Sequence, residues 1–290
     1  MNTATASEKL DKLWDYNAPE KTREQFLEYQ KNVDKTTPMY LELLTQLART
    51  HSLQQQFTEA HGLLDRVESE WTRATPVVQI RYFLERGRTY NSAGDKQSAG
   101  PLFQQALEVS TKHELDFYAV DAAHMLAIVA DSEAQIAWNL KAIELAENAK
   151  EERAKNWLGS LYNNLGWTYH DLKNYPEALQ LFEKNVRWHQ ERNSKEGLVI
   201  ALWSVARVQR SLGHYEQALA AQQQVVQKRK DLGLSEGGYA YEEIAENLWA
   251  LKRAREARPF FKKAYDLLSQ DPWLQSHESE RLKRLKSLSE

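Results

Sequence analysis

The 290-residue sequence contains no cysteine, which excludes disulfide bonds and thiolate metal ligands. Glycine and proline are scarce, with 11 and 7 residues scattered along the chain, and no long flexible linker is visible. The longest apolar run, near 125–130, is far shorter than the roughly 20 residues that a membrane-spanning helix needs. The formal net charge of −3 gives no global basic field for nucleic acid or anionic membranes.

Motifs of catalysis are missing as well. The eight histidines form no HExxH pattern, and neither a glycine-rich phosphate loop nor a GxSxG motif occurs. We therefore expect no enzyme activity, no metal and no cofactor. The absence of cysteine and of an apolar leader favours a cytoplasmic protein. Leu, Ala, Glu, Gln and Lys abound without any alternating strand pattern, which predicts an all-α fold.

A repeat of 39 to 40 residues organises most of the chain. Small residues at successive intervals of 39, 40, 39, 40 and 39 mark six units: Ala48, Gly87, Ala127, Gly166, Ala206 and Ala245. A second alanine follows 12 residues later in five units, and the third unit has a shorter connecting turn. Glycine costs about 1 kcal/mol in a helix relative to alanine, so close packing must offset that cost at Gly166. We expect Gly166 to face Ala178 where two helices of a hairpin cross.

The pattern predicts one continuous domain of six helical hairpins, at about 39–74, 77–113, 116–150, 156–193, 197–233 and 237–269. An array of repeats exposes an apolar face at each end unless another segment covers it. Amphipathic segments in 1–38, with Leu10, Phe26 and Leu27, and in 272–290 are therefore predicted to be capping helices. A partner-binding arm is the alternative, and two copies of the chain could also pair through the caps.

These units resemble the tetratricopeptide repeat (TPR) family, whose signature is an aromatic residue, Leu-Gly and Tyr on the first helix, then spaced Ala and Phe on the second. The fourth unit matches this signature at Tyr162, Leu165, Gly166, Tyr169, Ala178 and Phe182. The resemblance covers about four-fifths of the chain. The period exceeds the usual 34 residues and is similar to that of the long-repeat subgroup of about 40 residues. The resemblance implies a right-handed α-solenoid.

The resemblance also implies a non-enzymatic scaffold that binds a protein or peptide partner in its concave groove. A regulatory receptor that senses a ligand or peptide and acts through a second protein is the alternative. Helical repeats that read RNA need a basic groove, whereas the basic clusters here are interleaved with acidic residues. We therefore expect neither nucleic acid nor a membrane as a partner.

One stripe of each first helix faces the groove in this family. Counted from the small residues, the stripe predicts these binding residues: Arg49, Arg81, Glu85, Arg88, Asp121, His124, Asn163, Asn164, Trp167, Trp203, Arg207, Arg210, Glu242 and Glu246. The asparagines suit a peptide backbone, the tryptophans offer flat apolar surface, and the arginines can hold a carboxylate. Alternatively, these groups pair with one another, Asp121 with His124 and Arg207 with Glu246, or a terminal segment fills the groove.

Overall fold

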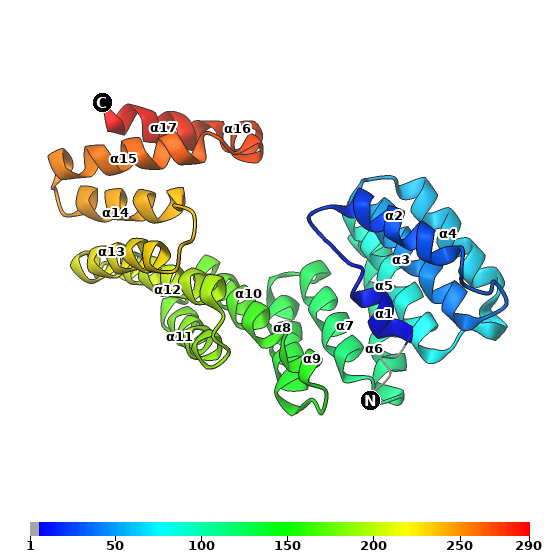
Figure 1. The fold of residues 1–290 in the computed structure, drawn as a ribbon. Coiled ribbons are helices and arrows are strands. Elements are labelled where there is room, and N and C mark those ends of the chain that lie inside the picture. Colours follow the sequence, from blue (N-terminus) through cyan, green and yellow to red (C-terminus); the bar gives the residue numbers. More distant parts are fainter. Residues whose placement is uncertain (1–5) are drawn as a thin grey trace. The chain divides into compact units, whose positions relative to one another are not determined.

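The computed structural model describes residues 6–290, and every regular element in that range is a helix (Figure 1). The sequence analysis expects one continuous domain. In the structure, the contacts within the chain define two compact units. Unit 1 ends at Trp157 and unit 2 comprises Leu158–Glu290. This division falls at the start of the fourth predicted repeat, after its second residue.

Unit 1 contains three helical hairpins and an N-terminal cap. The cap consists of α1 (Ala6–Asp11) and α2 (Pro19–Gln30). The hairpins are α3 (Pro38–Leu53) with α4 (Phe57–Ser69), α5 (Pro76–Ser92) with α6 (Lys96–Lys112), and α7 (Asp116–Val129) with α8 (Ser132–Asn148). A 3₁₀ turn, η1 (Trp71–Arg73), precedes α5, and the short α9 (Glu152–Lys155) follows α8.

Unit 2 has the same plan, with its cap at the other end. Its hairpins are α10 (Leu158–Asp171) with α11 (Tyr175–Glu191), α12 (Lys195–Ser211) with α13 (Tyr215–Asp231), and α14 (Gly238–Ala250) with α15 (Ala254–Leu268). The cap consists of α16 (Pro272–His277) and α17 (Ser279–Ser289), and α17 packs on α15 (Figure 1). The all-α fold of repeated TPR-like hairpins with helices at both ends is thus confirmed.

The turn inside a hairpin has one recurring backbone conformation. Seven positions after the small residue, five hairpins place a residue with positive φ, between 60° and 88°: Gln55, Gly94, Lys173, Gly213 and Lys252. The left-handed region reverses the chain within a few residues and closes the end of the first helix. The α7–α8 hairpin lacks this residue because α7 ends at Val129 and α8 begins at Ser132, so the shorter turn predicted for the third repeat is confirmed.

The helical glycines make room for phenylalanine rings. A Cβ atom on Gly166 would lie 2.6 Å from Cε1 of Phe182, and one on Gly87 would lie 2.5 Å from Cε1 of Phe103. Both rings are fully buried. A Cβ atom on Gly166 would therefore meet the ring of Phe182 first, and the contact of Gly166 with Ala178 stays a prediction. At these two positions the small residue makes room for a ring, and Ala178 is buried in the same core cluster as Phe182.

The terminal helices cover the apolar ends of their units. Leu10 and Phe26 are fully buried against α3, whereas Leu27 is exposed, contrary to its assignment to the apolar face. In unit 2, Leu282 and Leu285 of α17 are buried in the core formed with α14 and α15. The caps thus remove the apolar surface that a terminal hairpin would expose.

Candidate functional site

Five of the predicted stripe residues meet at one cavity of unit 1. It has a volume of about 410 Å³, and its walls include Arg49 from α3, Arg81, Glu85 and Arg88 from α5, and Asp121 from α7. Successive first helices present these side chains to the same space, as the stripe predicts. The cavity also has apolar walls, which come from Leu84, Phe117, Tyr118 and Trp157.

Two of the three arginines in this cavity are each held by two carboxylates. Arg88 binds Glu85, with Nη1 2.7 Å from Oε1, and also Asp121. Arg81 forms ion pairs with Asp11, at 2.6 Å, and with Glu42, at 2.9 Å. These carboxylates outweigh the effect of burial and raise the pKa of Arg81 and of Arg88 above the ordinary value. Both side chains are therefore fixed and neutralised within the protein.

Arg49 is different because it has no carboxylate of its own. Its Nε lies 3.6 Å from Oε2 of Glu85, whose other oxygen is already bound to Arg88. Within residues 6–290, no hydrogen bond to the Arg49 guanidinium is present, and the side chain is 20% exposed. Burial lowers the pKa of Arg49, and Glu85 compensates only in part. The donors of Arg49 are thus available to a molecule in the cavity.

The N-terminal cap closes one side of the cavity. Asp11, at the end of α1, binds Arg81 and lies 3.5 Å from Nη1 of Arg153, so it ties the cap to α5 and α9. Tyr16 lines the cavity and stacks on Trp14, with ring centroids 4.7 Å apart. The sequence analysis missed Asp11 and Tyr16, because the path of the cap is set by tertiary packing, and it also missed Glu42 of α3.

His124 does not line this cavity. Its ring packs on Trp157, with centroids 5.2 Å apart, and burial lowers its pKa. The sequence analysis gives Asp121 as an alternative partner of His124. In the structure, Asp121 forms an ion pair with Arg88. His124 therefore belongs to the packing between α7 and Trp157.

Unit 2 carries an aromatic row along the predicted stripe. The ring of Trp167 on α10 lies 5.8 Å from that of Trp203 on α12, and Trp203 lies 6.4 Å from Tyr239 on α14. Asn163 and Asn164 precede Trp167 on α10, and Oδ1 of Asn163 is buried without a hydrogen bond in the described part of the chain. The row joins three successive first helices.

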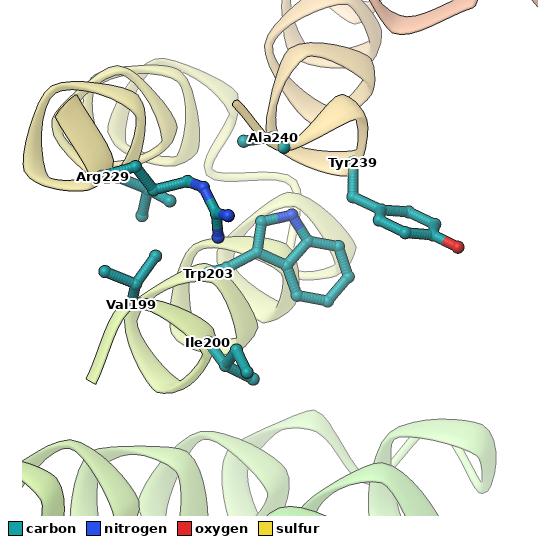
Figure 2. Close-up of a pocket in the computed structure, with 8 residues that line it drawn as sticks. Val199, Ile200, Trp203, Arg229, Tyr239 and Ala240 are labelled. Atoms are coloured by element: carbon teal, nitrogen blue, oxygen red, sulfur yellow. The ribbon is translucent and has the colours of Figure 1, made fainter. Parts of the chain in front are cut away.

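An apolar cavity opens beside this row. It has a volume of about 310 Å³ and is bounded by Val199, Ile200 and Trp203 of α12, Val225 and Arg229 of α13, and Gly237, Tyr239 and Ala240 at the start of α14. Figure 2 shows the indole of Trp203 between the guanidinium of Arg229 and the ring of Tyr239. Nε1 of Trp203 is a buried donor without a hydrogen-bond partner in residues 6–290.

The charged residues of the stripe in unit 2 pair within the protein. Glu243 accepts two hydrogen bonds from Arg210, at 2.7 and 3.0 Å, and lies 3.1 Å from Nε of Arg207. The alternative pairing of Arg207 with Glu246 is not formed, because Glu246 binds Arg284 of α17.

Glu242 binds another arginine of the same cap helix. Nε and Nη2 of Arg281 lie 2.9 and 2.6 Å from its two oxygens. The predicted residues Glu242 and Glu246 are thus occupied by α17, and the sequence analysis missed Glu243. A signal for it existed: Glu243 stands two positions before Ala245, as the predicted Glu85 stands two positions before Gly87.

Within residues 6–290, no group of three or more His, Cys, Asp or Glu side chains is arranged to hold a metal ion. In the same range, every helix is too short or too polar to cross a membrane.

Residues 157–231 match the tetratricopeptide repeat, a span that runs from the start of α10 to the end of α13. The hairpins before and after this span carry a small residue at the same position of the first helix, so the rest of the chain is similar to this repeat. No curated protein matches the sequence.

Several solved structures have a similar fold. One is the apo form of RapI, with a TM-score of 0.74 and 11% identity over 92% of this chain and 77% of that chain. Another is aspartyl phosphate phosphatase F from Bacillus subtilis, with a TM-score of 0.60 and 13% identity over 100% and 86%. A third is NprR in complex with its cognate peptide NprX, with a TM-score of 0.51 and 17% identity over 98% and 82%. At these identities the similarity concerns the fold alone.

Proposed function

We propose that the protein is a non-enzymatic scaffold that binds a peptide segment of a partner protein, with the apolar cavity of unit 2 as the anchor site. The observation that carries the proposal is an apolar cavity with exposed apolar walls: Ile200 is 54% exposed and Tyr239 is 41% exposed. Apolar pockets with a few polar groups are typical of ligand sites. A large apolar side chain of a peptide is the occupant that such walls favour.

Two donors beside the cavity favour a peptide over a purely apolar molecule. Nε1 of Trp203 lacks an acceptor in the described residues, and Arg229 uses Nε for the carbonyl of Ser235 at 2.8 Å. A peptide that anchors one side chain brings backbone carbonyls to the rim of the pocket, where the guanidinium of Arg229 can bind them, whereas the buried Nε1 of Trp203 can bind only a group that enters the cavity.

Trp167 and the asparagines before it extend the same surface along α10 and α12. The similarity in fold to NprR, which binds the peptide NprX, supports this class of function.

The test is a selection of peptides from a displayed random library on the purified full chain, followed by affinity measurement. We expect the selected peptides to share a large apolar residue. Ile200→Glu should weaken their binding about tenfold or more, because burial of one large apolar side chain contributes about 1.5–3 kcal/mol. Leu172→Glu is the matched control, since Leu172 is 50% exposed in the same unit but lies outside the cavity.

Equal binding of the selected peptides to wild type and to Ile200→Glu would refute the anchor site. A photoreactive phenylalanine analogue in place of Tyr239 gives an independent test, because a bound peptide should crosslink to it. Crosslinks only from positions outside the cavity would place the partner elsewhere.

A second candidate function is a regulatory receptor that senses a ligand and acts through another protein. The polar cavity of unit 1, with its enclosed arginines and aromatic walls, favours this candidate.

A further inference from the structure

The polar cavity of unit 1 differs chemically from the peptide anchor of unit 2. Its walls carry charged groups of both signs, and almost all of those groups are already paired: Asp11 and Glu42 hold Arg81, while Glu85 and Asp121 hold Arg88. Arg153, beside Asp11, has its own partner in Glu151 at 2.6 Å. Arg49 is the arginine of this cluster that lacks a hydrogen bond in the described residues.

A guanidinium presents its donors as a planar fork, and a carboxylate matches this fork with two parallel hydrogen bonds. Arg49 is positioned for such a bond, because its side chain lines the cavity and its one ion-pair partner within residues 6–290, Glu85, is shared with Arg88 and lies 3.6 Å away. Its burial is only partial, so an incoming group can reach it without displacing α3 or α5.

The remaining walls define what the carboxylate is attached to. Tyr16, Phe117 and Trp157 line the cavity, and aromatic faces suit an aromatic or aliphatic body. The guanidinium carbon of Arg153 lies 4.4 Å from the centroid of the Phe117 ring, and this cation–π contact fixes the orientation of the ring.

We propose that the cavity of unit 1 binds a carboxylate that carries an aromatic or apolar group, with Arg49 as its anchor and Tyr16 of the N-terminal cap against its body. The site is independent of the peptide anchor in unit 2, because the two cavities share no residue. The same chemistry is offered by a free small carboxylate and by the C-terminal carboxylate of a peptide that ends in an apolar residue.

The experiment titrates the full-length protein with 3-phenylpropanoate and with its amide, followed by ligand-observed NMR. We expect saturable binding of the acid with a Kd of about 1 mM or tighter, given the affinity per atom of small ligands. The amide should bind about tenfold more weakly or not at all, because it offers one acceptor and no charge. N-acetyl-alanyl-phenylalanine and its C-terminal amide form the second arm, which separates a peptide terminus from a free carboxylate as the source.

Two variants should change the affinity in opposite directions, which damage to the fold cannot do. Arg49→Gln should weaken binding of the acid about 10- to 100-fold, because it removes a charged double hydrogen bond. Glu85→Gln should strengthen binding about tenfold, because it removes a like charge beside the carboxylate and keeps an oxygen for Arg88. Arg66→Gln is the control, since Arg66 is an exposed arginine of unit 1 outside the cavity.

Saturable binding of either acid, lost in Arg49→Gln and retained in Arg66→Gln, supports the proposal. The acid that binds more tightly identifies the ligand as a free small carboxylate or as the C-terminus of a peptide. Three results would overturn it: no saturable binding of either acid, equal binding of acid and amide to the wild type, or undiminished binding to Arg49→Gln. The acid–amide comparison uses only the wild-type protein, so the proposal is tested even if a variant fails to fold.

Discussion

Replacing Gly87 by alanine tests whether the small column exists to admit the phenylalanine ring. The new Cβ would lie 2.5 Å from Cε1 of Phe103, whereas ordinary contact begins at 3.4 Å, so the ring or the helix must move by about 0.9 Å. Phe103 is fully buried, and the ring cannot turn away into solvent. Overpacking of this kind costs about 1–3 kcal/mol.

The intrinsic preference of alanine for helix acts in the opposite direction by about 1 kcal/mol. We therefore expect Gly87→Ala to be destabilising by about 0–2 kcal/mol in total. Gly100, on the other helix of the same hairpin, is the matched control because nothing lies within 4 Å of a Cβ placed there. Gly100→Ala should stabilise by about 0.5–1 kcal/mol, so the two variants should differ by about 0.5–3 kcal/mol.

The measurement is urea unfolding followed by circular dichroism, with both variants compared with the wild type. In a unit of this size, 1 kcal/mol corresponds to a change of about 2–4 °C in the thermal midpoint. Phe103→Leu should lower the free energy of unfolding less in the Gly87→Ala variant than in the wild type, because the smaller side chain relieves the overlap. If both glycine variants stabilise the protein equally, or if the double variant shows no coupling, the account of ring packing is refuted.

Two further predictions concern buried charge and pH. Glu243→Gln removes the carboxylate shared by Arg207 and Arg210. We expect the free energy of unfolding, measured in urea, to fall by about 2–4 kcal/mol, because two partly buried cations are left unpaired. An unchanged free energy of unfolding would show that water replaces Glu243. Burial lowers the pKa of His124 below its ordinary 6.5, so its contribution to stability is intact above pH 6.5 and is lost as pH falls through the folded-state pKa. The thermal midpoint should therefore drop less between pH 7.5 and 5.5 in His124→Gln than in the wild type, and identical drops would contradict this.

The repeat could be predicted from the sequence because close packing allows only small residues at one position of each first helix. Gly87 and Gly166 leave room for the rings of Phe103 and Phe182, each 16 residues later, and Ala245 precedes Phe261 by the same spacing, so pairs of a small residue and a ring recur in the sequence. The left-handed turn residues left a weaker signal. Gln55, Lys173 and Lys252 adopt the same conformation as Gly94, at a cost of about 1–2 kcal/mol that the closed hairpin offsets.

Counting along the helices grouped the side chains whose place depends on the helical register alone, whereas contacts made by the caps could not be predicted in this way. Arg81, Glu85 and Arg88 share one face of α5, so counting along the helix was enough to group them. Asp11 and Tyr16 come from a segment with no repeat register, and their place depends on how α1 and α2 pack on α3. The expected groove residues Glu242 and Glu246 bind arginines of α17, a contact that the sequence of the repeats does not encode.

A comparison of the two units shows how Arg49 differs from Arg207, the arginine at the same position of the repeat. In both units, the arginine that follows the small residue points at a glutamate of the next first helix: Arg49 at Glu85, and Arg207 at Glu243. Each glutamate also binds a second arginine, so neither can satisfy both partners fully. Arg207 compensates with a hydrogen bond to Oγ of Ser211, four residues later on the same helix, at 2.6 Å. The equivalent position after Arg49 is Leu53, which offers no acceptor. Two arginines at the same position of the repeat thus share a glutamate with a second arginine. Of these two, Arg49 lines a cavity and has no hydrogen-bond acceptor in the described residues, so a ligand in the cavity can supply one.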